Sequence, residues 1–166
     1  MIDLEKYMIP ATEAESDYQK VSPKYGSTIQ IKFLNKSFSV KVVYATSYEK
    51  DGRTHGNIEI LRKQADALRK ILPVLNKLSL ENKEKIVKAI QRDAKEYPGK
   101  DLPDDLNVFD YFVPRQIYVE NLYYKDNERR VVIMDPNYKC DPEHGAGIGF
   151  KNEEYSGGLV QADYYI

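Results

Sequence analysis

The sequence predicts an α+β domain in which an antiparallel sheet of about six strands is covered on one face by a pair of helices. Three observations predict this fold. Apolar residues alternate with polar ones in two early stretches, and they recur every three or four positions in the stretch that follows. Four later segments are rich in β-branched and aromatic residues. The expected order is two strands, two helices and four strands (ββααββββ). Residues 1–26 mix charge with proline, so we expect an irregular lead-in to a single domain over residues 1–166.

The first two strands are predicted as a hairpin. Apolar residues alternate with polar ones at Ile29, Ile31 and Phe33, and again at Phe38, Val40, Val42 and Tyr44. Residues 34–37 are expected to form the turn between them. Residues 49–57 are rich in turn formers and predict a loop, and Asn57 at its end is well placed to cap a helix.

The helical region has an apolar stripe and one interruption. The stripe consists of Leu61, Ala65, Leu68, Leu72, Leu75 and Leu78. Pro73 lacks a backbone N–H and clashes with the preceding turn, so a break is expected near Ile71 or Leu72. Ser79 is predicted to cap a second helix, which ends at Pro98-Gly99 and whose stripe contains Leu80, Val87, Ile90, Ala94 and Tyr97.

The rest of the chain is predicted to be mainly strand. Residues 99–110 are acidic and contain proline, which is typical of a connector. Four segments rich in β-formers or flanked by turn formers predict strands at 116–124, 129–134, 147–150 and 159–166. Residues 125–128 are expected to form a hairpin turn between the first two of these strands.

Charge and hydropathy limit the function classes. The formal net charge of -1 gives no long-range field to attract nucleic acid or an anionic membrane. Residues 58–97 nevertheless hold ten basic and six acidic residues, whereas residues 135–166 hold two basic and six acidic ones. No run approaches the roughly 20 apolar residues that span a bilayer. We therefore expect a cytoplasmic protein that needs no cofactor and binds neither membranes nor nucleic acid.

Cysteine and glycine patterns exclude several chemistries. Cys140 is the only cysteine, so neither an intrachain disulfide nor a cysteine-built metal site can form within one chain. A neighbouring carboxylate, here Asp141, raises the pKa of a thiol and argues against a nucleophile. The glycines at 145, 147 and 149 follow neither a phosphate-loop nor a dinucleotide-binding spacing.

The run Asp141-Pro142-Glu143-His144-Gly145 has two interpretations. In the structural one, Asp141-Pro142 starts a turn, and Gly145 supplies a positive φ angle. In the functional one, His144 works with Asp141, Glu143 or Asp135 as a general base or metal ligand. The only other histidine is His55, and His55, His144 and Asp141 would be the ligands of an alternative metal site. The sequence leaves both interpretations open.

This run, the following strand with Ile148 and Phe150, and a last strand after Gly157-Gly158 together resemble the end of small bacterial domain-of-unknown-function families. Some of these families are linked to polymorphic toxins as candidate immunity proteins. The resemblance covers about the last 30 residues. It implies a protein partner, a cognate toxin or effector, whose basic active site would be covered.

Tyrosine is abundant in the C-terminal half. Exposed tyrosines beside acidic residues would suit a protein interface, whereas buried ones would replace Trp and Phe in the core. Both alternatives stay open. The candidate partner-binding residues are Tyr138, Asp141, Glu143, His144, Gly145, Tyr155 and Tyr164.

The leading hypothesis is a non-enzymatic cytosolic protein-interaction domain, with a toxin-immunity protein as its specific form. The alternative is a small metal-dependent hydrolase centred on His144 and its neighbouring carboxylates. A third hypothesis, nucleic-acid binding, rests on basic residues that alternate with acidic ones and are more typical of a solvated helix face: Lys83, Lys85, Lys88, Arg92 and Lys95. The sequence predicts neither the partner's identity nor the oligomeric state.

Overall fold

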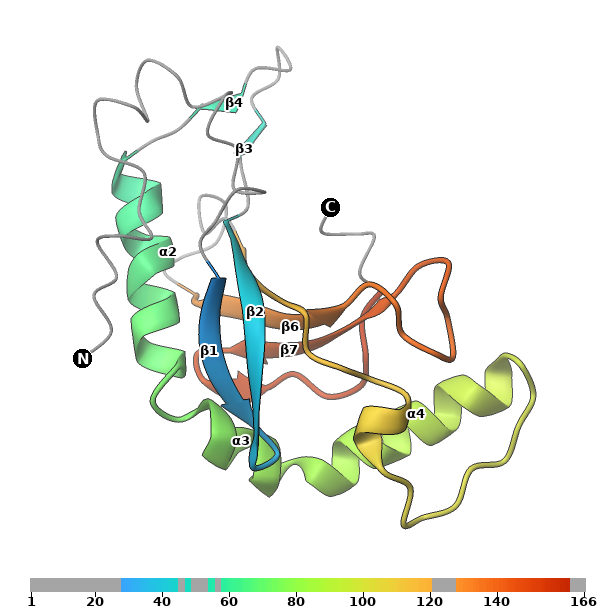
Figure 1. The fold of residues 1–166 in the computed structure, drawn as a ribbon. Helices are drawn as coiled ribbons and strands as arrows, with labels where there is room; N and C mark the ends of the chain where they lie inside the picture. Colours follow the sequence, from blue (N-terminus) through green and yellow to red (C-terminus); the bar gives the residue numbers. More distant parts are fainter. Residues whose placement is uncertain (1–27, 45–46, 49–53, 56–57, 121–127, 162–166) are drawn as a thin grey trace.

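The computed structural model describes residues 28–44, 47–48, 54–55, 58–120 and 128–161, which are coloured in Figure 1. It confirms the predicted α+β class, with an open six-stranded sheet and helices packed against it. The expected lead-in, the capping role of Asn57 and the site residue Tyr164 lie outside the described residues. The expectation of a single domain stays a prediction.

The sheet has the strand order β1-β2-β5-β6-β7-β8. These strands are β1 (Thr28–Phe33), β2 (Lys36–Tyr44), β5 (Gln116–Val119), β6 (Arg130–Asp135), β7 (Ala146–Lys151) and β8 (Glu154–Tyr155). All neighbouring pairs are antiparallel except β2 and β5, which are parallel. This pair differs from the expected all-antiparallel sheet because the helices between β2 and β5 form a crossover, and a crossover lets the chain re-enter a sheet in the same direction.

Four segments differ from the prediction. Two short strands pair with each other: β4 (Thr54–His55) lies within the loop expected over residues 49–57, and β3 (Ser47–Tyr48) lies just before it. The strand β8 was not predicted, and it pairs with the end of β7. The predicted last strand is represented among the described residues by an isolated bridge between Val160 and Gly147.

The turn of the predicted hairpin consists of Leu34 and Asn35, whose φ angles are 47° and 64°. Such positive values are characteristic of two-residue hairpin turns. The helix α3 (Leu75–Glu81) holds this turn: Ser79 Oγ accepts a hydrogen bond from the Leu34 N–H at 2.8 Å, and Asn76 Oδ1 accepts one from the Asn35 N–H at 2.8 Å. The hairpin and the helices are thereby joined by one buried and one exposed hydrogen bond.

The predicted pair of helices is a series of three. The helix α2 (Ile58–Ile71) ends where the break before Pro73 was expected, and α3 is separated from α4 (Lys83–Glu96) at Asn82. The predicted capping role of Ser79 is wrong, because this residue is inside α3 and 0% exposed. Its hydroxyl is used by the hairpin turn instead, a long-range contact that helical periodicity does not reveal.

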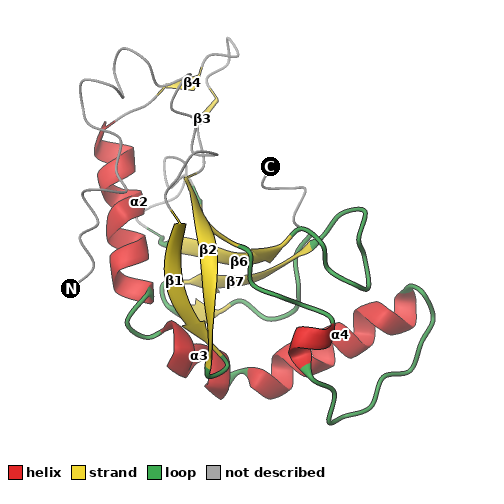
Figure 2. Cartoon of the chain, in the orientation of Figure 1, coloured by secondary structure: helices red, strands yellow, loops and turns green. Residues whose placement is uncertain are grey.

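The helices cover one face of the sheet, and Figure 2 shows them following one another around it. One core joins inward residues of the strands, such as Phe33, Val42 and Ile133, with helical residues that include Leu68, Ile71, Ile86 and Ile90. Two residues that the sequence analysis assigned to the apolar stripe of the second helix are exposed instead. Leu80 is 40% exposed and Tyr97 is 72% exposed. The basic residues Lys83, Lys85, Lys88, Arg92 and Lys95 are exposed, as expected for a solvated face.

A second, smaller cluster on the other face of the sheet contains Val132 and Met134. Gly147 lies against it, and a Cβ atom there would be 2.5 Å from Val132 Cγ1 and 3.1 Å from Val160 Cγ2. The backbone of Val160 pairs with that of Gly147 through two hydrogen bonds of 2.7 and 3.0 Å. The absence of a side chain therefore permits the segment that follows β8 to approach β7.

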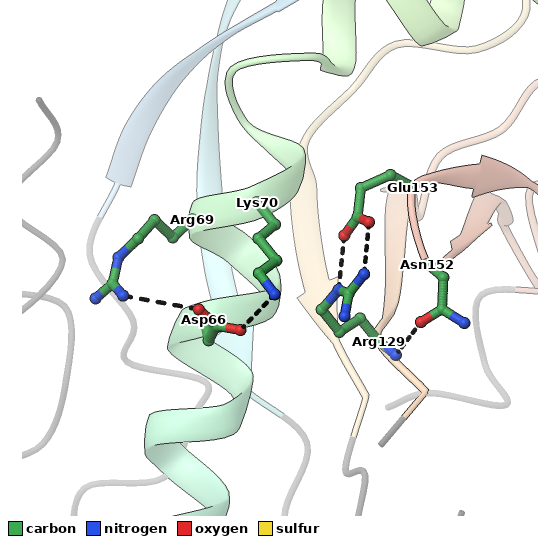
Figure 3. A network of polar contacts seen from close by, with 6 residues as sticks. All are labelled: Asp66, Arg69, Lys70, Arg129, Asn152 and Glu153. Carbon is green, nitrogen blue, oxygen red and sulfur yellow. Dashed lines mark hydrogen bonds and ion pairs between the residues drawn. The ribbon is translucent and has the colours of Figure 1, made fainter. Parts of the chain in front are cut away.

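A polar network lies where the β7–β8 turn approaches α2 (Figure 3). The Arg129 guanidinium donates to both oxygens of Glu153 at 2.8 and 2.7 Å. On α2, Asp66 lies within ion-pair distance of Arg69 and Lys70. The hydrogen bond from Arg129 lowers the pKa of Glu153.

No described helix has both the length and the apolarity to cross a membrane.

We expect Gly147→Ala to lower the free energy of unfolding by about 1–3 kcal/mol, the usual effect of overpacking. The added methyl group would overlap Val132 and displace Val160. Urea denaturation would measure the change. Gly149→Ala is the matched control, because the atom nearest to its added Cβ is the exposed Ser156 hydroxyl at 3.0 Å, which can rotate away. Equal losses in the two variants would contradict this account.

Candidate functional site

A cavity of about 620 Å³ lies between the C-terminal end of α4, the turn that connects β6 to β7, and residues 159–161. Figure 1 shows the connecting turn in orange, beyond the end of the sheet. Five of the seven predicted site residues line this cavity: Tyr138, Asp141, Glu143, His144 and Gly145. Tyr155 does not line it, and Tyr164 lies outside the described residues.

The start of the connecting turn is fixed by Asp135, which is 2% exposed at the end of β6. Its Oδ2 accepts a hydrogen bond from the Val113 N–H at 2.7 Å, and its Oδ1 accepts from the Asn137 N–H at 2.9 Å and from Arg115 Nε at 3.1 Å. A carboxylate at such a buried position requires several donors. Asp135 therefore ties the segment before β5 to the segment after β6.

Local hydrogen bonds shape the motif around Asp141. Its side-chain Oδ1 accepts from the His144 N–H at 3.2 Å, and its carbonyl oxygen accepts from the Gly145 N–H at 2.8 Å. Gly145 has a φ of 67°, so the structural interpretation is confirmed at this residue. The tight turn also brings Glu143 and His144 to the same cavity, which an extended strand would not do.

The His144 ring contacts the same carboxylate. Its Nδ1 lies 3.0 Å from Asp141 Oδ1 and 3.1 Å from Asp141 Oδ2. Both side chains are partly exposed. A carboxylate in this position holds an imidazole in one orientation. The structure thus shows the side-chain contact that the functional interpretation requires, and the chemical role of His144 stays a prediction.

The helix α4 supplies the part of the wall that sequence reasoning missed. Asp93 and Glu96, followed by Tyr97, line the cavity from the last turn of this helix and its C-cap. Tyr138 is only 1% exposed and belongs to the core, but its hydroxyl donates to Asp93 Oδ2 at 3.3 Å. The sequence contains one sign that Asp93 could line a site: it lies three residues after Ile90, at the edge of the buried face of the helix.

Burial is the main cause of the altered pKa values at the site. It raises the pKa of Asp93, and the nearby Glu96 and Asp141 carboxylates add to this, whereas the Tyr138 hydroxyl and Arg92 oppose it. Burial also raises the pKa of the Cys140 thiol, and the carboxylate that adds to this effect is Asp93 rather than the neighbouring Asp141 expected from the sequence. Outside the cavity, burial raises the pKa of Tyr155 to about 12, and its hydroxyl donates to the Gly158 carbonyl at 2.7 Å.

The cavity wall is acidic. It includes the carboxylates of Asp93, Glu96, Asp141 and Glu143, and no lysine or arginine is among the described residues that line it. Within the described part of the chain, no group of three or more His, Cys, Asp or Glu residues is arranged to hold a metal ion. The side chain of His55 lies outside the described residues, so the alternative set of His55, His144 and Asp141 stays a prediction.

We expect Asp135→Ala to lower the free energy of unfolding by about 1–3 kcal/mol, because three partly buried hydrogen bonds would lose their shared acceptor. Chemical denaturation would measure this loss. Asp110→Ala is the control: Asp110 is exposed, and such substitutions change the stability by about 0.5 kcal/mol or less. If the two variants were equally stable, Asp135 would not have the anchoring role described above.

No protein-family model, curated protein sequence or solved structure matches this chain. Its function must therefore be argued from the shape and chemistry of the cavity.

Proposed function

We propose that this chain is a non-enzymatic protein-interaction domain of the cytosol, and that its acidic cavity receives a basic segment of a partner protein. One observation carries the proposal. Carboxylates from two separate elements, α4 and the Asp141–Gly145 turn, line one cavity to which the described residues contribute no lysine or arginine. A cation placed there would meet negative charge from both elements, which favours fast and specific association with a basic partner.

The rim and the apolar wall suit a long basic side chain. Tyr97 is 72% exposed where α4 ends, and an aromatic face of this kind attracts an arginine or lysine cation. Leu159 and Val160 also line the cavity and offer contact for the alkyl part of such a side chain. A volume of about 620 Å³ is within the range in which proteins bind small ligands or individual side chains.

The specific form of this proposal is a toxin-immunity protein. The resemblance of the C-terminal part to families associated with toxin immunity supports it, as does the fact that the turn carrying the resemblance forms one wall of the acidic cavity. An acidic surface of this kind would complement a basic active site and block it. The partner would then be a basic toxin or effector.

We expect the protein to bind a capped hexa-arginine peptide, as measured by isothermal titration calorimetry near pH 7. The double variant Glu96→Gln/Glu143→Gln should bind about two- to twenty-five-fold more weakly, because exposed ion pairs contribute about 0.2–1 kcal/mol each. The control Glu81→Gln/Glu84→Gln removes the same charge from exposed positions away from the cavity and should bind like the wild type.

Equal weakening by the two double variants would mean that net charge, rather than the cavity, attracts the peptide. Absence of binding by the wild type at low salt would refute the proposed function. The immunity form has its own test, in which the protein is co-expressed with the toxin candidates encoded beside its gene. Wild-type protein should protect the cells, the cavity variant should protect them less, and the control variant should protect them fully.

The contact between His144 and Asp141 supports a second candidate function, a small hydrolase in which His144 acts as a general base. We expect such an enzyme to hydrolyse chromogenic ester or phosphodiester substrates, and to lose this activity in both His144→Ala and Asp141→Asn. Zinc or manganese should raise the rate if the hydrolase is metal-dependent. Hydrolysis that persists in both variants would rule out this candidate.

A further inference from the structure

We infer that a cation binds in this cavity in exchange for a proton, which leaves the Asp93 carboxyl group as the basic side chain enters. The inference rests on the proposed function, because it concerns the cationic partner of the same cavity. It adds a specific acceptor for the cation and a pH dependence of binding. Four steps support it.

First, Asp93 occupies a poor position for a negative charge. It is half-buried, and it lies in the last turn of α4, where its own carbonyl accepts the Tyr97 N–H at 2.9 Å. The C-terminal end of a helix carries a partial negative charge and disfavours carboxylates. One described side chain donates a hydrogen bond to Asp93, the Tyr138 hydroxyl at 3.3 Å.

Second, few of the surrounding groups stabilise the ionised form. On α4 itself, Glu96 repels it and Arg92 attracts it. The connecting turn contributes Tyr138, Cys140 and Asp141, of which Asp141 repels it. His144 and Glu143 line the same cavity, and Tyr155 of β8 is close enough to be influenced by Asp93. With burial, these repulsions hold the pKa of Asp93 above its ordinary value of 3.8.

Third, an entering guanidinium group reverses this balance. It brings the positive charge that the described cavity wall lacks, and the O–H bond of Asp93 then breaks to leave a carboxylate facing the cation and a proton in solvent. Linkage makes the effect reciprocal: if the cation lowers the pKa of Asp93, then a higher pH strengthens cation binding. The effect should appear over the range in which Asp93 is still protonated in the empty cavity.

Fourth, the titration of Asp93 should also change how the stability of the protein without a bound cation depends on pH. Because the folded-state pKa of Asp93 is raised, its contribution to the free energy of unfolding is fully present below pH 3.8 and is lost as the pH rises through the folded-state value. Asparagine carries no titrating proton. We therefore expect Asp93→Asn to flatten this part of the stability profile.

Calorimetry with capped hexa-arginine at a series of pH values from about 4 to 6.5 tests the exchange, because the arginine side chains keep their charge throughout and Asp93→Asn removes the titrating proton of Asp93. Titrations in two buffers with different ionisation enthalpies give the number of protons released. We expect the wild type to release up to about one proton per complex, with log Kd changing by up to about one per pH unit. Asp93→Asn should still bind but release far fewer protons. The control Glu84→Gln lies on the same helix but away from the cavity, and it should release as many protons as the wild type.

The outcomes separate the two ideas. Wild-type binding without proton release, or unchanged release by Asp93→Asn, would overturn the proton exchange and leave the proposed function intact. An equal loss of the release in Glu84→Gln would mean that net charge, rather than Asp93, sets the number of protons, and would also overturn it. No binding at any pH would refute both, and the urea-denaturation profiles of ligand-free wild type and Asp93→Asn would then show whether Asp93 nonetheless titrates as described.

Discussion

The cavity depends on one buried carboxylate, that of Asp135. Its three donors, Val113, Arg115 and Asn137, come from the segment before β5 and from the residue pair that follows β6. This arrangement fixes the point at which β6 ends and the connecting turn begins. Tyr138 can then enter the core, and the Asp141 turn can close on itself a few residues later. A buried carboxylate with three donors is a specific constraint, because an apolar replacement would leave those donors unsatisfied.

The other half of the cavity is positioned by the helices, and their position follows from the hairpin. Ser79 and Asn76 hold α3 against the β1–β2 turn, so the chain cannot leave the sheet in a single long helix. It bends at Pro73 and at Asn82, and α4 then reaches the end of the sheet where the connecting turn lies. The helices carry the chain back along the sheet. As a result β5 runs in the same direction as β2 and pairs with it in parallel. The acidic cavity thus forms where two independently fixed segments meet.

Local patterns predicted the elements, and long-range contacts decided the rest. Alternation identified β1 and β2, Pro73 identified the end of α2, and Gly145 was correctly assigned a positive φ, because each of these features depends on neighbouring residues. The errors at Ser79 and Tyr97 have the opposite origin. Whether a helical residue is buried depends on what packs against it, and the partner of Ser79 is 45 residues away in sequence. Asp93 was overlooked for the same reason, as its hydrogen-bond donor, Tyr138, is also 45 residues away.

The two parts of the cavity wall differ in how their charges are supported, and this difference bears on function. Asp141 is held by its own turn and by the His144 ring, so its place in the structure has a sufficient local reason. Asp93 has no comparable support: burial and two neighbouring carboxylates oppose its charge, while one hydrogen bond and Arg92 favour it. Residues that lower stability where they line a cavity are expected at functional sites, since the same position would be more stable with a neutral side chain. A cation supplied by a partner would remove this conflict at Asp93. A general base at His144 would leave it unresolved, which is why cation binding accounts for more of the cavity than hydrolysis does.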